Sequence, residues 1–299
     1  MNVFFSLVKR NVKLYFKDKV TFFTSLITPF ILLILFVLFL NNVYKDMVDS
    51  ILSQASITTT NSIKNSIVAS WFIASILSTS SITVSFCSAT LMVNDKINKS
   101  AQDIDVAPVS KKVVFLAYFC STFISTMIVM GCILVIGFVF IAIVGWYLSF
   151  VSILKIIGAV ILLTLFGSAL ACIIFTFIKS SGGMSAIATL ISSCYGFLSG
   201  AYTPLSQYPK TVANLLGFNP GIYGNCILKS SFMLDPINTI SNLPKEIKNA
   251  FETNFDLNYS FFNNHVSTGL CYIILSIVVV ALLSIFISIV FSKNNKSVN

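Results

Sequence analysis

Charge is scarce in this chain of 299 residues, because only 10% of them are Asp, Glu, Lys or Arg, and His265 is its one histidine. Metal sites in proteins use clusters of His, Cys, Asp and Glu at short spacings, and no such spacing occurs. The phosphate-binding pattern GxxxxGK[ST] is also absent, as are GxSxG, HExxH and CxxC. We therefore expect no catalytic site, no metal and no cofactor in this chain.

Ionisable residues are missing from the interior of the long apolar runs, apart from Lys155 near one end. Such residues inside a membrane mark proton relays and ion-coupled carriers, so the sequence disfavours a proton-driven carrier. A sodium-coupled carrier is disfavoured less, because hydroxyl and carbonyl oxygens can hold sodium. Six of the seven cysteines lie in apolar runs, where they pack as small apolar side chains.

Long apolar runs are what the sequence has in abundance. Hydrophobic residues make up 56% of the chain, and the mean hydropathy is +0.92. The hydrocarbon core of a bilayer needs about 20 helical residues, and a lipid-exposed backbone must form its own hydrogen bonds. We expect an all-α polytopic membrane protein, a single transmembrane domain over residues 1–299 with six spans: Val20–Leu40, Ile67–Val93, Val113–Val144, Ile153–Ile178, Met184–Tyr202 and Gly269–Phe291.

Basic residues divide unequally between the connecting segments. With six spans both termini share one side, and the segments on that side carry twelve basic and four acidic residues, a net charge of +8. The segments on the other side carry seven basic and six acidic residues, a net charge of +1. The positive-inside rule then places both termini in the cytoplasm of a cell membrane protein. The basic excess is a topology signal, so nucleic acid is not an expected partner.

The segment before the first span, residues 1–19, has the pattern of a helix that lies flat on the membrane surface. Its cations gather on one side at helical spacing, with apolar residues on the remaining arc: Lys9, Arg10, Lys13 and Lys17. Such a helix buries its apolar side at the lipid boundary and places its cations among headgroups. A solvated basic tail is the alternative. A secretory leader is disfavoured, because the following apolar run is too long and lacks a small-residue cleavage site.

Three connecting segments have distinctive compositions. Residues 94–112, between the second and third spans, are short and mixed in charge, and they fit either a docking knuckle for a soluble partner or an ordinary connector. Residues 203–266 carry five of the seven prolines, which divide the segment into short amphipathic pieces such as Lys210–Leu216 and Lys245–Phe255. Its apolar first half could enter the outer leaflet as a re-entrant helix. Residues 41–66 are polar and predict a cap or flexible loop.

Hydroxyl groups are frequent in the second and fifth spans. Ser and Thr can bond to the preceding turn of their own helix and allow neighbouring helices to approach closely, so packing is the commoner reason for them. The functional interpretation is a weakly polar path for an amphipathic substrate. Its candidate residues are Ser78, Thr79, Ser81, Ser85, Ser192, Ser193, Tyr195 and Ser199.

Two stretches carry a family likeness. In the first, Asp95 and the Ala107–Ser110 run (APVS) fit, although Lys99–Ser100 stand where a Gly-Thr or Gly-Ser pair is usual. The second contains Gly200, two prolines about five residues apart, and an Asn-Pro before Tyr223. With the six spans and the flat basic helix, these stretches resemble the permease subunits of type-2 ATP-binding-cassette (ABC-2) exporters over nearly the whole chain.

The resemblance implies a permease that pairs with a second copy or a sister permease and with separate ATPase subunits, which would bind ATP and Mg²⁺. It implies a coupling segment that docks on the ATPase through Asp95, Lys99, Asp103, Asp105, Pro108 and Ser110. The second and fifth spans would line the path, and an outer gate would contain Gly200, Pro204, Pro209 and Pro220. The expected substrate is hydrophobic or amphipathic: a drug, an antimicrobial peptide or a lipid-like molecule. The alternatives are an ATPase-independent carrier and a membrane sensor or immunity protein that binds a peptide with its outer loop.

Overall fold

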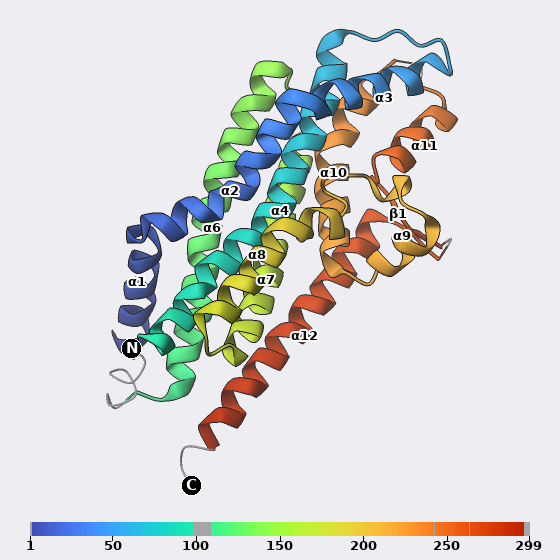
Figure 1. The fold of residues 1–299 in the computed structure, drawn as a ribbon. Coiled ribbons are helices and arrows are strands. Elements are labelled where there is room, and N and C mark those ends of the chain that lie inside the picture. Colours follow the sequence, from blue (N-terminus) through green and yellow to red (C-terminus); the bar gives the residue numbers. More distant parts are fainter. Residues whose placement is uncertain (1, 99–108, 242, 263, 296–299) are drawn as a thin grey trace.

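The computed structural model describes residues 2–98, 109–241, 243–262 and 264–295, and these residues form a helical bundle (Figure 1). Five helical stretches are long and apolar enough to cross a membrane. They are the stretch Lys19–Ser53, α4 (Asn61–Ile97), α6 (Lys111–Val144), α7 (Phe150–Phe177) and α12 (Thr268–Asn295), the last through Ser292. The chain is therefore a polytopic α-helical membrane protein, as the apolar runs predict.

The one remaining expected span, Met184–Tyr202, corresponds to a shorter helix, α8 (Ser181–Leu198). Its 18 residues rise about 27 Å, slightly less than a bilayer core. Gly182 and Gly183 and several hydroxyl side chains lower its hydropathy, and α8 is not among the five stretches. α8 thus lacks the length and apolarity of those five stretches.

The first long stretch is continuous through three elements. α2 (Lys19–Leu35) passes through a π-helical turn, η1 (Phe36–Leu40), into α3 (Asn41–Ser53). The prediction of a cap or flexible loop over residues 41–66 was wrong through Ser53 and again from Asn61, where α4 begins. Tyr44, Val48, Ile51 and Leu52 recur on one face of α3 and are buried, so the polar residues between them cover only the other face.

α4 is the central helix of the bundle. It packs against α2, α6, α7, α8 and α10 (Pro220–Asn238), and nearly all of its residues from Ser66 to Ala89 are buried. Small side chains permit this close packing. At Gly167 of α7, an added Cβ atom would lie 2.8 Å from the Ser81 carbonyl oxygen, so only glycine fits where α7 crosses α4.

The expected outer loop, residues 203–266, is mostly folded. It contains η2 (Leu205–Gln207), α9 (Lys210–Leu216), α10, α11 (Lys245–Asn254) and an antiparallel hairpin of β1 (Tyr259–Phe261) and β2 (Asn264–Val266), in which Tyr259 pairs with Val266. α9 and α11 match the predicted amphipathic pieces. α10 was not predicted as a buried element, yet it packs between α4, α7 and α12. α3 and α11 lie at one end of the bundle, and α1 (Asn2–Lys17) lies at the other (Figure 1).

Candidate functional site

Asp95, at the last turn of α4, is the centre of a cluster at the α1 end of the bundle. Its carboxylate accepts two hydrogen bonds from the Arg10 guanidinium, at 3.0 and 3.2 Å, and one from the Tyr118 hydroxyl at 2.6 Å. Arg10 belongs to α1 and Tyr118 to α6, while Asp95 is only 5% exposed. We call Arg10, Asp95, Lys96 and Tyr118 the Asp95 cluster.

The charges in this cluster satisfy one another. The hydrogen bonds from Arg10 to Asp95 raise the pKa of the guanidinium, against the opposing effect of burial. Paired bonds between arginine and a carboxylate are strong and fix orientation. The Tyr118 hydroxyl supplies a further bond to this buried carboxylate, so the three helices are held in one arrangement.

Lys96 extends the cluster to a fourth helix. Its ammonium group donates to the carbonyl oxygens of Phe175, Thr176 and Ile178, at 2.8, 3.2 and 3.4 Å. These carbonyls lie at the end of α7, where no later turn supplies a helical N–H. Successive residues of a helix point about 100° apart, so Asp95 and Lys96 reach different neighbours. The end of α4 therefore holds α1, α6 and α7 together.

A cavity of about 290 Å³ lies beside this cluster, and Arg10, Asp18, Asn94, Asp95 and Asn98 are among its lining residues. The predicted coupling segment starts at this end of α4. Asp95 is thus placed, and Ser110 occupies the N-cap position of α6 without a side-chain capping bond. The other predicted coupling residues lie outside the described residues: Lys99, Asp103, Asp105 and Pro108.

The predicted surface cations of α1 divide into two kinds. Lys9, Lys13 and Lys17 are exposed. Arg10 instead turns inward to Asp95. The buried side of α1, with Val8, packs against the bundle and mainly against α6.

The predicted path residues of α4 are buried inside the bundle: Ser78, Thr79, Ser81 and Ser85. The Ser85 hydroxyl donates to the Ser81 carbonyl oxygen at 2.7 Å and lies 3.4 Å from the hydroxyls of Thr126 and Ser168, on α6 and α7. In contrast, the Ser78 hydroxyl has no hydrogen-bond partner among the described residues. In α8, Ser193 is exposed, Ser192 is half-buried and Tyr195 is buried, and the C-cap residue Ser199 is also buried.

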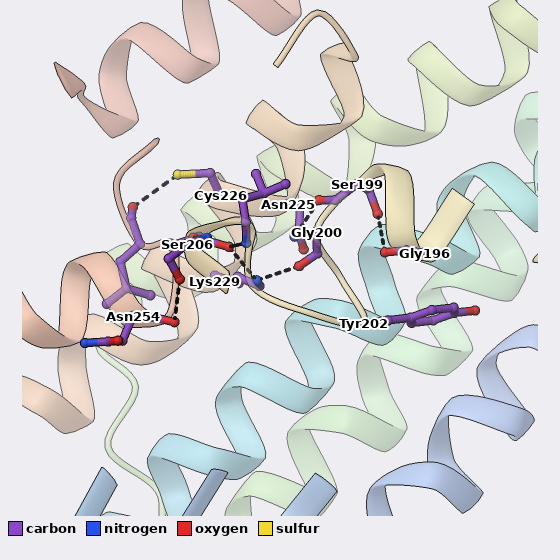
Figure 2. Close-up of polar contacts among 12 residues, drawn as sticks. Gly196, Ser199, Gly200, Tyr202, Ser206, Asn225, Cys226, Lys229 and Asn254 are labelled. Atoms are coloured by element: carbon purple, nitrogen blue, oxygen red, sulfur yellow. Dashed lines mark hydrogen bonds and ion pairs between the residues drawn. The ribbon is translucent and has the colours of Figure 1, made fainter. Parts of the chain in front are cut away.

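A second cluster, of Gly200, Asn225, Lys229 and Asp256, lies beyond the end of α8, and we call it the Lys229 cluster. Figure 2 labels Gly200, Asn225 and Lys229. Lys229, on α10, is fully buried and donates to the Gly200 carbonyl oxygen at 2.8 Å. Its ammonium group lies 3.7 Å from the Asp256 carboxylate. That carboxylate also accepts hydrogen bonds from the backbone N–H groups of Leu205 and Ser206. The cluster therefore fixes the chain segment between α8 and α9 against α10.

Burial acts on both charges of this pair. It lowers the pKa of Lys229, while the Asp256 charge opposes the change. It raises the pKa of Asp256, while Lys229 and the two backbone N–H groups oppose that change. A buried ion pair forgoes hydration that its mutual attraction only partly replaces. The Lys229–Asp256 pair therefore fixes the relative position of its two side chains, at some cost in the free energy of unfolding.

Of the four predicted gate residues, Gly200 belongs to this cluster and Pro204 adjoins it. Gly200 has a left-handed φ of +71°, and Pro204 is buried directly before η2. Asn225 donates to the Ser199 carbonyl oxygen at 2.9 Å. Pro209 and Pro220 lie apart from the ion pair, at the starts of α9 and α10.

Reasoning from the sequence missed Tyr118, Lys96, Lys229 and Asp256 as site residues. For Lys229 a signal was present, since it is the only charge in the stretch 221–234. For the other three, the contacts join helices that are distant in the sequence. In the described part of the chain, no group of three or more His, Cys, Asp and Glu residues could hold a metal ion.

Comparison with known proteins identifies the family to which this architecture belongs. No curated protein and no solved structure matches the chain. A family model described as "ABC-2 type transporter" matches residues 2–233, which run from α1 into α10. The match includes the whole Asp95 cluster and, apart from Asp256, the Lys229 cluster. The chain belongs to the ABC-2 type transporter family, as a non-catalytic membrane permease.

Proposed function

We propose that this chain is the permease of an ATP-driven exporter that moves a hydrophobic or amphipathic substrate out of the cell. ABC-2 permeases pair with ATPase subunits, and such a subunit would bind the ATP and Mg²⁺. The observation that carries the proposal is the Asp95 cluster. It joins the end of α4 to three other helices, at the start of the segment predicted to dock on the ATPase.

The cluster gives a physical route for coupling. A displacement of residues 94–112 by an ATPase would act first on Asp95 and Lys96. The ion pair with Arg10 would carry the displacement to α1, and the three bonds of Lys96 would carry it to α7. A packed bundle has discrete arrangements rather than a continuum, so a push at this end selects one of two states of the bundle.

The properties of α8 support its assignment to the translocation path. It is shorter and more polar than the other expected spans, and Ser193, Phe197 and Leu198 on it are exposed. A second permease facing α8 would enclose a path lined by hydroxyl and apolar groups, which suits an amphipathic substrate. The Lys229 cluster then lies at the outer end of this path, next to the Gly200 turn, and would hold the outer gate.

The orientation follows from charge. Lys9, Lys13 and Lys17 are exposed on α1, and the positive-inside rule places that end in the cytoplasm. Both termini would then be cytoplasmic in the cell membrane, and α3, α9, α11 and the hairpin would face outward. Cysteine labelling from outside should modify a Ser206→Cys variant and not a Lys13→Cys variant. The opposite result would contradict this orientation.

The function is tested by reconstitution. The tagged chain should copurify with an ATPase subunit from its own cell, and the reconstituted pair should move a fluorescent amphipathic dye across vesicle membranes when ATP is supplied. Mutation of the phosphate-binding lysine of the ATPase should abolish this transport. Dye movement that survives the mutation would contradict the proposal and favour an ATPase-independent carrier.

A further inference from the structure

A cavity of about 540 Å³ lies between η2 and α9 on one side and α11 and β1 on the other. Its volume is within the range of small-molecule sites, about 300–1,000 Å³. The elements that line it, α9, α11 and β1, lie together and away from α1 (Figure 1). Its lining includes Lys210, Asn214, Glu252, Asn258 and Tyr259.

Three charged side chains line this cavity, and one of them, Asp256, is already paired with Lys229. The other two, Lys210 and Glu252, have opposite signs and stand on different elements. Lys210 begins α9, and within the described ranges it has no ion-pair partner. Glu252, on α11, accepts one hydrogen bond, from the Asn258 amide at 2.7 Å, through its Oε2 atom. A ligand that satisfies both must carry an anionic group for Lys210 and a cationic group for Glu252.

Two lining asparagines, Asn214 and Asn258, each use one atom of the side-chain amide in a hydrogen bond. The other atom of each amide is left for a ligand. The Asn214 Oδ1 atom accepts from the Phe262 backbone N–H at 3.2 Å, which leaves the Asn214 Nδ2 group to donate. The Asn258 Nδ2 group donates to Glu252, which leaves the Asn258 Oδ1 atom to accept. One amide donor and one amide acceptor are together the complement of a peptide group.

The walls of the cavity are already held in place. Asp256 binds the backbone of Leu205 and Ser206 on one side, and the Tyr259 hydroxyl donates to the Ala213 carbonyl oxygen at 2.8 Å on the other. The Tyr259 ring meets the Phe261 ring with centroids 6.3 Å apart. Because a ligand need not order these walls, little of its binding free energy is lost to ordering them.

We propose that this cavity binds a short peptide with free termini. The carboxylate terminus pairs with Lys210, the ammonium terminus pairs with Glu252, and the backbone between them bonds to Asn214 and Asn258. A neutral sugar would leave both charges unpaired. The proposal depends on the proposed function only for the side of the membrane that the cavity faces, since binding requires neither an ATPase nor ATP.

Tri-alanine is the probe, with the full chain in lipid nanodiscs and no ATPase, and binding is measured by calorimetry. Tri-alanine should bind, and its acetylated and amidated form should bind at least about tenfold more weakly, equivalent to about 1.4 kcal/mol. Lys210→Met and Glu252→Gln should each weaken binding of the free peptide by a similar factor. Neither variant should change binding of the capped form, because that form has no terminal charge.

Lys245→Met and Glu246→Gln are the matched controls, since both residues lie on the first turn of α11 and neither lines the cavity. They should bind tri-alanine like the unmodified chain. Equal binding of the free and capped peptides, or tighter binding of maltotriose, would overturn the proposal. Absence of tri-alanine binding to the correctly folded chain up to about 5 mM would also overturn it. Each of these results leaves the ATP-driven transport assay unaffected, so the two proposals can fail separately.

Discussion

Arg10 and Asp95 are 85 positions apart in the sequence, and their side chains form two hydrogen bonds at 3.0 and 3.2 Å. The pair joins the helix that precedes the first span to the last turn of the central helix. Asp95 is buried and Arg10 is half-buried, so water competes only partly for the bonds. A movement of the end of α4 therefore acts on α1 through a direct contact.

Removal of one partner of this pair should weaken both stability and coupling. Arg10→Met or Asp95→Asn leaves the other group without a charged partner, which should lower the free energy of unfolding by about 1–3 kcal/mol. The loss of ATP-driven transport should exceed the loss that a smaller fraction of folded protein explains. Thermal unfolding in nanodiscs and vesicle transport measure the two effects.

The control is Lys13→Met, because Lys13 is exposed on the same helix and carries the same charge. The double variant Arg10→Met with Asp95→Asn should recover part of the lost stability, since neither charge is then orphaned. If Lys13→Met reduced transport as much as Arg10→Met does, the ion pair would have no special role in coupling.

The Lys229–Asp256 pair should be sensitive to loss of either member. Lys229→Met leaves the Asp256 carboxylate buried beside apolar groups, and unpaired buried charges of this kind lower stability by about 3–5 kcal/mol. The double variant Lys229→Met with Asp256→Leu should be much closer to the original stability, apart from the lost bonds to Leu205 and Ser206. Equal stability of the single and double variants in thermal unfolding would contradict a buried ion pair.

Asp256 should also give the protein a measurable pH dependence. Burial raises the pKa of Asp256 in the folded protein above its ordinary value of 3.8. As the pH falls through the raised pKa, the folded state binds a proton that the unfolded state does not yet bind, so protonation favours the folded state. Relative to Asp256→Asn, the unmodified chain should thus gain stability as the pH falls towards 3.8. An unchanged difference between the two melting temperatures across this window would contradict the raised pKa.

A side chain at position 200 should destabilise the protein. Its φ of +71° strains any residue with a Cβ atom, and that atom would lie 2.9 Å from the Leu205 side chain. Gly200→Ala should lower the free energy of unfolding by about 1–2 kcal/mol. Gly158→Ala is the control: Gly158 lies inside α7 with no neighbouring atom within 4 Å of the added Cβ, so it should be neutral or slightly stabilising.

The positions of the long helices could be predicted because lipid imposes length and apolarity on each crossing. α8 fits that rule least well, since its glycines and hydroxyls reduce the apolar signal. α10 was assigned to an outer loop because five of the seven prolines lie in residues 203–266 and divide that segment into short pieces. Its burial comes from contacts with α4, α7 and α12, which local pattern does not contain.

The site residues also divide into those that a local pattern indicates and those that only contacts between distant parts of the chain bring together. Asp95 was found through a local motif at the end of an apolar run. Its partners Arg10 and Tyr118 lie 85 and 23 residues away, on helices whose relative placement is set by packing. Lys229 and Asp256 likewise meet only because α10 enters the bundle. Sequence pattern thus singled out Arg10, Asp95 and Gly200, each for a separate reason, and the three-dimensional arrangement supplied their partners.

The hydroxyls of α4 can be divided by experiment between packing and transport. Ser85 bonds within its own helix and lies near hydroxyls of two other helices, so Ser85→Ala should lower the free energy of unfolding by about 1 kcal/mol. Ser78 has an unpartnered hydroxyl in the described structure, so Ser78→Ala removes no hydrogen bond and should leave stability within about 0.5 kcal/mol. If the hydroxyls of α4 contact the substrate during transport, Ser78→Ala should still reduce dye transport. Unchanged transport by Ser78→Ala, together with reduced stability of Ser85→Ala, would assign these hydroxyls to packing and place the path on α8.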